Sequence, residues 1–302
     1  MTRNQAFLLL HLCVFLWGFT AILGEAISFD SVSLVWWRLI IVNISLLIFM
    51  VLTRRKLILN KFIFWKLAGV GAIVGLHWLC FFGGIKVANI SITMISFSTG
   101  TFFTALIEPI VYKRKLNWNE VIIGLLIIVI ISFIGVSEFE NSENPVAGIF
   151  LGSMAAFTAA LFSTFNGKLI QKSNAFTISL FELIFAFALV SVGLFIFFDV
   201  PENLLTPSSQ DIWYLLLLGV VCTAFPFIAS VEVMKKLSPF SVNLAVNLEV
   251  VYAIILGYFI FGEKEQMTPT FYICGILIGV LIVFNEVLKR NRKKRKELKE
   301  AK

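Results

Sequence analysis

The side chains most able to do chemistry in this sequence lie inside long apolar stretches. Glu249 is the clearest case, within VNLAVNLEVVYAIILGYFIFGE at residues 242–263. An ionised side chain at the centre of a lipid bilayer costs roughly 3 kcal/mol on insertion scales. Glu249 is therefore either a group that binds a proton or pairs with a substrate, or a carboxylate that is hydrogen-bonded inside a helix bundle and fixes its packing. The residue types alone leave both interpretations open.

Three further ionisable residues have the same double character. Arg38 either extends to the membrane surface or bonds a carbonyl of the bundle, or else meets an anionic substrate. His77 is either a neutral core histidine or a cavity residue that handles substrate or protons. Glu108 lies about one turn from the end of its segment, beside Lys113, which favours a helix-end carboxylate over a second coupling group. Glu249, Glu108 and Arg38 are our candidates for coupling or ion pairing.

The spacing around Glu249 places it on a face of small residues. Residues four apart share one face of a helix, so Glu249 aligns with Ala245, Ala253 and Gly257. Such stripes let membrane helices approach closely. We therefore expect Glu249 to lie near a helix–helix interface and not toward lipid.

Two asparagines on the same segment compete with Glu249 for a cavity. Asn243 and Asn247 are four residues apart, and both lie about 120–160° around the helix from Glu249. On one continuous helix, all three side chains cannot point into one cavity. Either the asparagines or Glu249 would face it, and the sequence does not choose.

The composition indicates what kind of protein must position these groups. Of the 302 residues, 59% are hydrophobic and 14% are charged, and the mean hydropathy is +0.94. Soluble domains are about 45–50% apolar and about 25% charged, so we predict a polytopic membrane protein. The apolar run after Arg3 is not followed by a small-residue cleavage site, so we interpret it as the first membrane helix. The isolated cysteines predict neither disulfides nor a metal site, and we expect no cofactor.

Ten segments are long and apolar enough to span a bilayer, which needs about 20 mainly apolar residues. We predict an all-α protein with ten transmembrane helices at 5–24, 32–52, 66–86, 89–111, 119–137, 146–170, 176–198, 211–233, 240–261 and 268–288. Basic and acidic connections alternate, which by the positive-inside rule places both termini in the cytoplasm. The basic tail after Leu288 directly follows a membrane helix, so we expect it to contact anionic lipid headgroups and not nucleic acid.

The sequence contains an internal repeat. A shift of 149 residues aligns STGTFFTALIEPIVYKRKL (98–116) with NLEVVYAIILGYFIFGEKE (247–265). This divides the chain into five-helix repeats at 1–140 and 141–288, followed by a cytoplasmic tail at 289–302. Because five is odd, the second repeat must be inverted in the membrane, an arrangement typical of transporters that alternate access around a midplane site.

Several motifs make a family resemblance specific. FLWGFTAILG (15–24), WWRLI (36–40), KKLSPFSVNLAVNLEVVYAIILGYFIFGE (235–263) and GILIGVLIVF (275–284) resemble the EamA branch of the drug/metabolite transporter superfamily over essentially the whole chain. The family's usual LEPV is Leu248-Glu249-Val250-Val251 here, so the ninth helix lacks a kinking proline. The resemblance implies a central cavity between the halves. Our candidates for its lining are Trp17, His77, Trp78, Phe81, Asn166, Asn243 and Asn247.

Together these features predict a secondary transporter of the bacterial cytoplasmic (inner) membrane. We expect it to export a small amphipathic or zwitterionic, amino-acid-like metabolite by alternating access. A polyphosphate would require several basic groups at depth, which the segments lack. Protons are a possible coupling partner. The alternatives are an intramembrane enzyme, a lipid flippase or a receptor, and the sequence leaves substrate, coupling and oligomeric state open.

Overall fold

The computed structural model of the chain describes residues 1–135, 143–198, 200–202, 204–261, 273, 276–285 and 287–288. Every regular element in these ranges is helical, and they contain no strand. The elements are α1 (Arg3–Ala26), α2 (Ser31–Thr53), α3 (Lys61–Val87), α4 (Ile90–Phe97), α5 (Gly100–Tyr112), α6 (Trp118–Gly135), α7 (Pro145–Leu169), α8 (Ala175–Phe197), α9 (Ser209–Leu216), the π-helical η1 (Leu217–Ala224), α10 (Phe225–Val233), α11 (Pro239–Val246) and α12 (Leu248–Phe261). A short helix also covers Ile276–Asn285.

Seven spans among the described residues are long and apolar enough to cross a membrane. They are α1, α2, α3, α4 with α5, α7, α8, and the continuous run of α9, η1 and α10. The described parts of the other three predicted segments form α6, α11 with α12, and the helix at 276–285, which do not meet that criterion. The described part of the chain is all-helical and has the apolar spans of a polytopic membrane protein, and the count of ten stays a prediction. The basic tail at 289–302 lies outside the described residues.

Polar side chains determine where the helices begin. Asp30 accepts hydrogen bonds from the backbone N–H groups of Val32 and Ser33, and Thr2 forms a capping box with Gln5. The remaining side-chain caps are Asn60, Asn89, Asn144, Asn174, Ser208 and Ser238. Because the first N–H groups of a helix have no intrahelical partner, these residues stabilise helix starts at the polar edges of the apolar stretches.

Two of the predicted spans are each broken into two helices. α4 ends before Ser98 and Thr99, and α11 ends before Asn247. At both breaks, hydroxyl or amide groups of these residues donate to carbonyls of the preceding turn, which competes with regular helix geometry. This corrects the expectation of one continuous helix at 89–111 and at 240–261. The 149-residue shift places Ser98 on Asn247, so the two breaks occupy the same position of the internal repeat.

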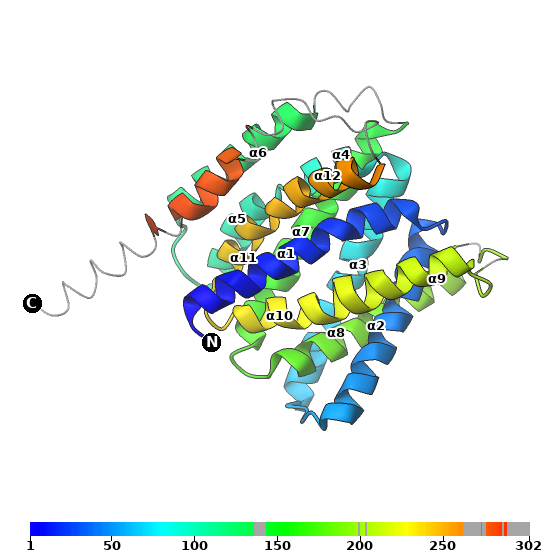
Figure 1. Ribbon diagram of the computed structural model, residues 1–302. Coiled ribbons are helices and arrows are strands. Elements are labelled where there is room, and N and C mark those ends of the chain that lie inside the picture. Colours follow the sequence, from blue (N-terminus) through cyan, green and yellow to red (C-terminus); the bar gives the residue numbers. More distant parts are fainter. Residues whose placement is uncertain are drawn as a thin grey trace, which may run out of the picture.

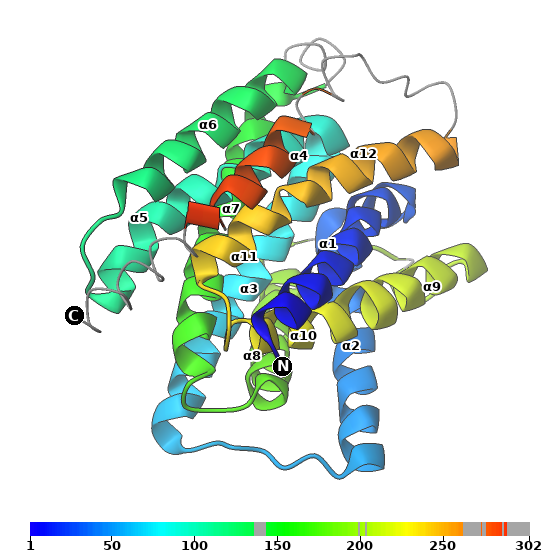
Figure 2. The same ribbon diagram turned by 60° about the vertical axis from the view of Figure 1, so that its left-hand side comes forward.

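The helices pack around a central group of α3, α7 and α8. α1 crosses the bundle with α12 on one side and α10 on the other (Figure 1). α6 lies at the outer edge against α5, and the connection from α2 to α3 runs along one end of the bundle (Figure 2). This arrangement brings segments from both halves of the sequence next to α1.

Gly18 lies where α1 closely approaches α12. A Cβ atom at Gly18 would lie 2.7 Å from Tyr252 Cβ and 3.3 Å from the backbone nitrogen of Ala253. We predict that Gly18→Leu lowers the free energy of unfolding by about 1–3 kcal/mol, because overpacking forces the two helices apart. Gly69→Leu is the matched control, since a Cβ there has no neighbour within 4 Å. Thermal unfolding in detergent would measure both, and equal melting temperatures would contradict the assigned contact.

Candidate functional site

A cavity of about 80 Å³ lies between helices from both halves of the chain. Its aromatic walls are Trp17, Trp78, Phe81, Phe97, Phe162 and Phe227. Its polar lining consists of Thr20, Arg38, His77, Ser163, Thr223, Ser230, Asn243 and Glu249. A cavity needs about 10–15 Å³ of such volume for one water, so this one has room for several waters or a small polar group. It therefore combines an apolar body with groups of both charges.

Arg38 is the cationic group of the cavity. Its Nε donates a hydrogen bond to Thr223 Oγ1 at 2.8 Å, and its guanidinium carbon lies 4.1 Å from the centre of the Trp78 ring. Thr223 in turn donates to the carbonyl of Leu218, five residues earlier, within the π-helical turn of η1. Arg38 thus stays inside the bundle, with a hydroxyl group and an aromatic face as partners. Stacking on an aromatic ring suits a guanidinium, which is planar and more weakly hydrated than an ammonium.

Glu249 is the anionic group, and its one hydrogen-bond contact among the described residues is weak. Thr20 Oγ1 lies 3.4 Å from Glu249 Oε1, but it lies 2.7 Å from the carbonyl oxygen of Trp17. A hydroxyl group has one proton, which the shorter contact takes. The contact of Thr20 Oγ1 with Glu249 Oε1 is therefore long and weak for a hydrogen bond. Glu249 and Arg38 line the same cavity, yet they form no ion pair within the described part of the chain.

His77 is both bonded to the bundle and exposed to the cavity. Its Nδ1 lies 2.9 Å from the carbonyl oxygen of Ala155, which accepts only, so Nδ1 carries a proton. In the neutral ring, Nε2 is then an acceptor. Phe81, Phe97 and Phe162 pack around the imidazole with ring centres 5.3–6.1 Å away. The two interpretations of His77 from the sequence are therefore not exclusive.

The two asparagines of the ninth predicted span, Asn243 and Asn247, lie in different environments. Asn243 lines the cavity and donates to Ser163 Oγ at 2.7 Å. Asn247 lies outside it and donates to Thr101 Oγ1 at 2.6 Å. Because the helix breaks at Asn247, the rotation between Asn243 and Glu249 is not that of one continuous helix, and both reach the same cavity. This corrects the expectation that only one of them would do so.

Asn166 also lies outside the cavity. Its Nδ2 donates to Glu182 Oε2 at 2.9 Å, and both side chains are buried. Glu182 contacts Asn166 and not Arg38, although a weaker alignment of WWRLIIV (36–42) with LFELIFA (180–186) places the two charged residues at matching positions. Trp17, Trp78 and Phe81, by contrast, line the cavity, and their role in substrate binding stays a prediction.

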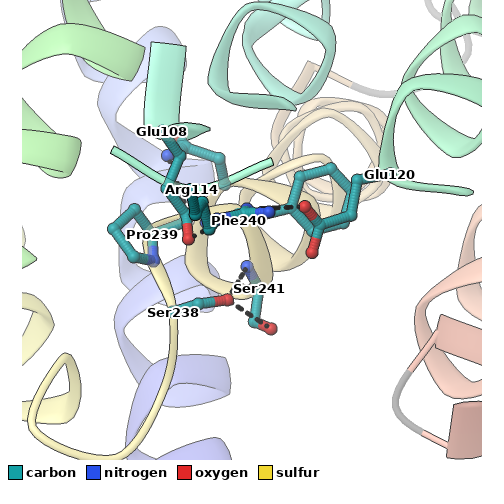
Figure 3. A network of polar contacts seen from close by, with 8 residues as sticks. Glu108, Arg114, Glu120, Ser238, Pro239, Phe240 and Ser241 are labelled. Carbon is teal, nitrogen blue, oxygen red and sulfur yellow. Dashed lines mark hydrogen bonds and ion pairs between the residues drawn. The ribbon is translucent and has the colours of Figure 1, made fainter. Parts of the chain in front are cut away.

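Glu108 lies at one end of the bundle and caps α11, which begins more than 130 residues later in the chain. Its Oε2 accepts the backbone N–H of Phe240 at 2.9 Å, in the first turn of α11 (Figure 3). Its Oε1 lies 3.2 Å from Arg114 Nη2, which also contacts Glu120 Oε2 at 2.7 Å. The ion-pair partner is thus Arg114 and not the neighbouring Lys113. This environment matches a helix-end carboxylate outside the cavity.

The Arg114 guanidinium remains charged in this cluster. Partial burial lowers its pKa, but the hydrogen bond to Glu120 and the charges of Glu108 and Glu120 outweigh burial, so the pKa is raised above the ordinary value. The cluster therefore holds α5, α6 and α11 together at any physiological pH. A second contact at the same end is the bond from Lys168 Nζ to the carbonyl of Val111, at 2.9 Å.

Asp211 joins two helices at the opposite end. Its carboxylate accepts hydrogen bonds from the backbone N–H of Ser28 at 2.8 Å and from Ser28 Oγ at 2.7 Å. Lys86 Nζ donates to the carbonyl of Ile27 at 2.8 Å beside it. α1, α3 and α9 are therefore tied together where α1 and α3 end. Both ends of the bundle hold contacts between the two halves of the sequence.

The hydroxyl groups of the cavity are not predictable from the sequence. Thr20, Ser163, Thr223 and Ser230 carry no signal in the sequence, because such residues in membrane helices commonly bond to their own backbone. The described residues include no group of three or more His, Cys, Asp or Glu side chains that could hold a metal ion.

Comparisons with known proteins place this geometry in context. The model of the "EamA-like transporter family" matches residues 4–136 and again residues 146–285. "Uncharacterized transporter YdfC" of Bacillus subtilis is 23% identical over 266 residues, which are 84% of this chain and 82% of that protein. An "Uncharacterized transporter" of Archaeoglobus fulgidus is 22% identical over 288 residues, which are 92% of this chain and 98% of that protein. A solved protein, described as "Crystal structure of protein", superposes on this chain with a TM-score of 0.72 at 14% sequence identity. The superposition includes 96% of this chain and 99% of the other, which shows a shared fold.

Proposed function

The chain belongs to the EamA-like transporter family, and we propose that it exports a small zwitterionic, amino-acid-like metabolite. The family resemblance from the sequence is confirmed, and the protein is an integral membrane transporter and not an enzyme. The observation that carries the proposal is that Arg38 and Glu249 line one aromatic-walled cavity without pairing with each other. A ligand that carries both charges would satisfy both groups.

The chemistry of the cavity favours this substrate class. A guanidinium binds a carboxylate through two parallel hydrogen bonds, which suits Arg38 to the acidic end of an amino acid. Glu249 would accept the ammonium group, and the Trp17 and Phe162 side chains of the wall would contact an apolar side chain. A buried polar group that lacks its partner costs about 1–3 kcal/mol, so a substrate with only one of the two charges would bind less well.

We further propose that transport occurs by alternating access between two inverted five-helix repeats, 1–140 and 141–288, within a ten-helix fold. Two matches of one family model along the chain support the repeat, as do the helix breaks at Ser98 and Asn247. Discontinuous helices at a repeat interface are common at transporter binding sites. The basic connections support cytoplasmic termini in the bacterial inner membrane, with the Glu108 contacts at the cytoplasmic end and the Asp211 contacts outside.

The outer contacts give a prediction about opening. Asp211→Asn should increase opening toward the outside about fivefold, because an amide replaces a charge-assisted acceptor of Ser28 and turns a donor toward it, a loss of about 1 kcal/mol. The measurement is the labelling rate of Ser230→Cys by an impermeant maleimide, with the native cysteines replaced by alanine. Asp30→Asn is the control, since that side chain caps only its own helix. Equal rates in both variants would contradict the assignment of Asp211 to an outer gate.

The function itself is tested by substrate identification. Metabolite profiles of the medium should differ between a deletion strain and an overproducing strain in a compound with one carboxylate and one amine. Purified protein in proteoliposomes should then move that compound saturably. Binding without movement would indicate a receptor, and movement of phospholipid between leaflets would indicate a flippase.

A further inference from the structure

A groove on the outer side of α10 is separate from the transport cavity. Phe227 and Ser230 of α10 line the cavity, whereas Ile228, Ala229 and Glu232 of the same helix line the groove. The groove has a volume of about 770 Å³ and runs between α2, α8, η1 and α10. It therefore lies on the opposite face of α10, and the proposed transport does not use it.

The walls of the groove are apolar and open to the bilayer. Leu46 and Phe49 of α2, Phe176 of α8 and Val220 and Phe225 of the η1–α10 run line it. Phe49, Val220 and Phe225 are 40%, 40% and 46% exposed, so the groove is reached from the side of the bundle. In a membrane-spanning protein this side faces hydrocarbon, and a hollow of this kind takes an acyl chain.

The end of the groove beyond Thr53, the last residue of α2, is basic. Arg55, Lys56 and Lys235 line it there. Lys235 Nζ lies 2.7 Å from Glu232 Oε1, so its charge is matched within the protein. Arg55 and Lys56 form no ion pair in the part of the chain that the structure describes, and two positive charges remain unmatched. Because they follow the end of a membrane helix, they lie at the level of lipid headgroups.

Hydrogen bonds fix this basic end in place. Asn174 Nδ2 donates to the carbonyl of Lys56 at 3.2 Å, and the backbone N–H of Ile58 donates to Thr177 Oγ1 at 3.0 Å. Ser173 Oγ donates to the carbonyl of Ile58 at 2.7 Å. The connection after α2 is thus held against the start of α8, and its cations are positioned over the apolar groove.

We propose that the groove is a binding site for one anionic phospholipid, with its phosphate at Arg55 and Lys56 and an acyl chain between α2 and α10. Basic pockets between membrane helices bind anionic headgroups, and each basic side chain near the surface contributes about fivefold in affinity. The charge at the mouth and the apolar length behind it match the two parts of such a lipid. A free phosphate would use only the mouth, and a zwitterionic lipid would gain little from its charge.

The test uses the full-length protein in detergent and short-chain phosphatidylglycerol as the probe. Binding is measured by native mass spectrometry and by the shift of the melting temperature. We expect phosphatidylglycerol to bind, and Arg55→Gln with Lys56→Gln to weaken that binding by roughly tenfold or more. Lys113→Gln with Lys115→Gln removes two exposed lysines elsewhere and should leave it unchanged. Ser45→Phe, which fills the groove, should also weaken binding.

Four outcomes would overturn the proposal. Equal binding of phosphatidylcholine and phosphatidylglycerol would show that the basic mouth does not select the headgroup. Full competition by inorganic phosphate would show an ion site and not a lipid site. Equal losses in the groove and control lysine variants would show a non-specific charge effect. Unchanged binding in Ser45→Phe would show that the acyl chain lies elsewhere. Because the Arg55 and Lys56 side chains are exposed, their variants should fold even if Ser45→Phe does not.

Discussion

Glu249→Gln should abolish substrate accumulation driven by a pH gradient while leaving the protein folded. In everted membrane vesicles with an acidic lumen, an exporter that exchanges protons for substrate accumulates substrate inside. Glutamine keeps the size of the side chain and an oxygen that accepts from Thr20 Oγ1, but it cannot take up or release a proton. We expect accumulation in the variant to fall to the level of vesicles without the protein.

The matched control is Glu182→Gln, which changes a buried glutamate outside the cavity. It should keep pH-driven accumulation, provided that its melting temperature shows a folded protein. If Glu249→Gln folds normally and accumulates substrate at the wild-type level, Glu249 has no role in coupling. Loss in both variants would indicate that coupling is not specific to the cavity carboxylate.

Arg38→Lys should weaken substrate binding by about 10- to 100-fold, and Arg38→Gln should weaken it further. The lysine keeps a charge but loses the bidentate geometry of the guanidinium, its contact with the Trp78 ring and its Nε bond to Thr223. Charge-assisted hydrogen bonds contribute about 1.5–3 kcal/mol, which gives the expected range. Isothermal titration of the purified variants with the identified substrate measures the loss.

Arg114→Lys is the control for Arg38, because it alters an arginine in the end cluster with two carboxylate partners and no part in the cavity. Its dissociation constant should stay within about twofold of wild type. Tight binding to Arg38→Gln would show that the cavity arginine does not contact the substrate.

The membrane helices could be predicted from the hydropathy of the sequence. The helix breaks could not, because a few polar atoms determine where they occur. Long apolar runs predict membrane helices because the backbone must satisfy its own hydrogen bonds in lipid. The breaks at Ser98 and Asn247 depend on single side chains that bond to the preceding turn, and no average over a segment detects them. The break at Asn247 lets Asn243 and Glu249 line the same cavity, which one continuous helix would not allow.

Contacts between segments that are distant in the sequence could not be predicted either. Arg38 and Glu249 are more than 200 residues apart, and nothing in either local pattern indicates that they line the same cavity. The partner of Arg38 is Thr223, in a π-helical turn that no periodicity predicted. Glu108 accepts a hydrogen bond from the backbone of Phe240, 132 residues further along the chain.

The central claim is that one substrate bridges Arg38 and Glu249, and substrate analogues test it most directly. The measurement is uptake by proteoliposomes of the identified metabolite, its carboxamide analogue and its analogue without the amine. Wild-type protein should prefer the metabolite to both analogues by at least about tenfold. Arg38→Gln should lose the discrimination against the carboxamide, and Glu249→Gln should lose the discrimination against the analogue without the amine. If both variants rank the three compounds as the wild type does, one substrate does not bridge Arg38 and Glu249.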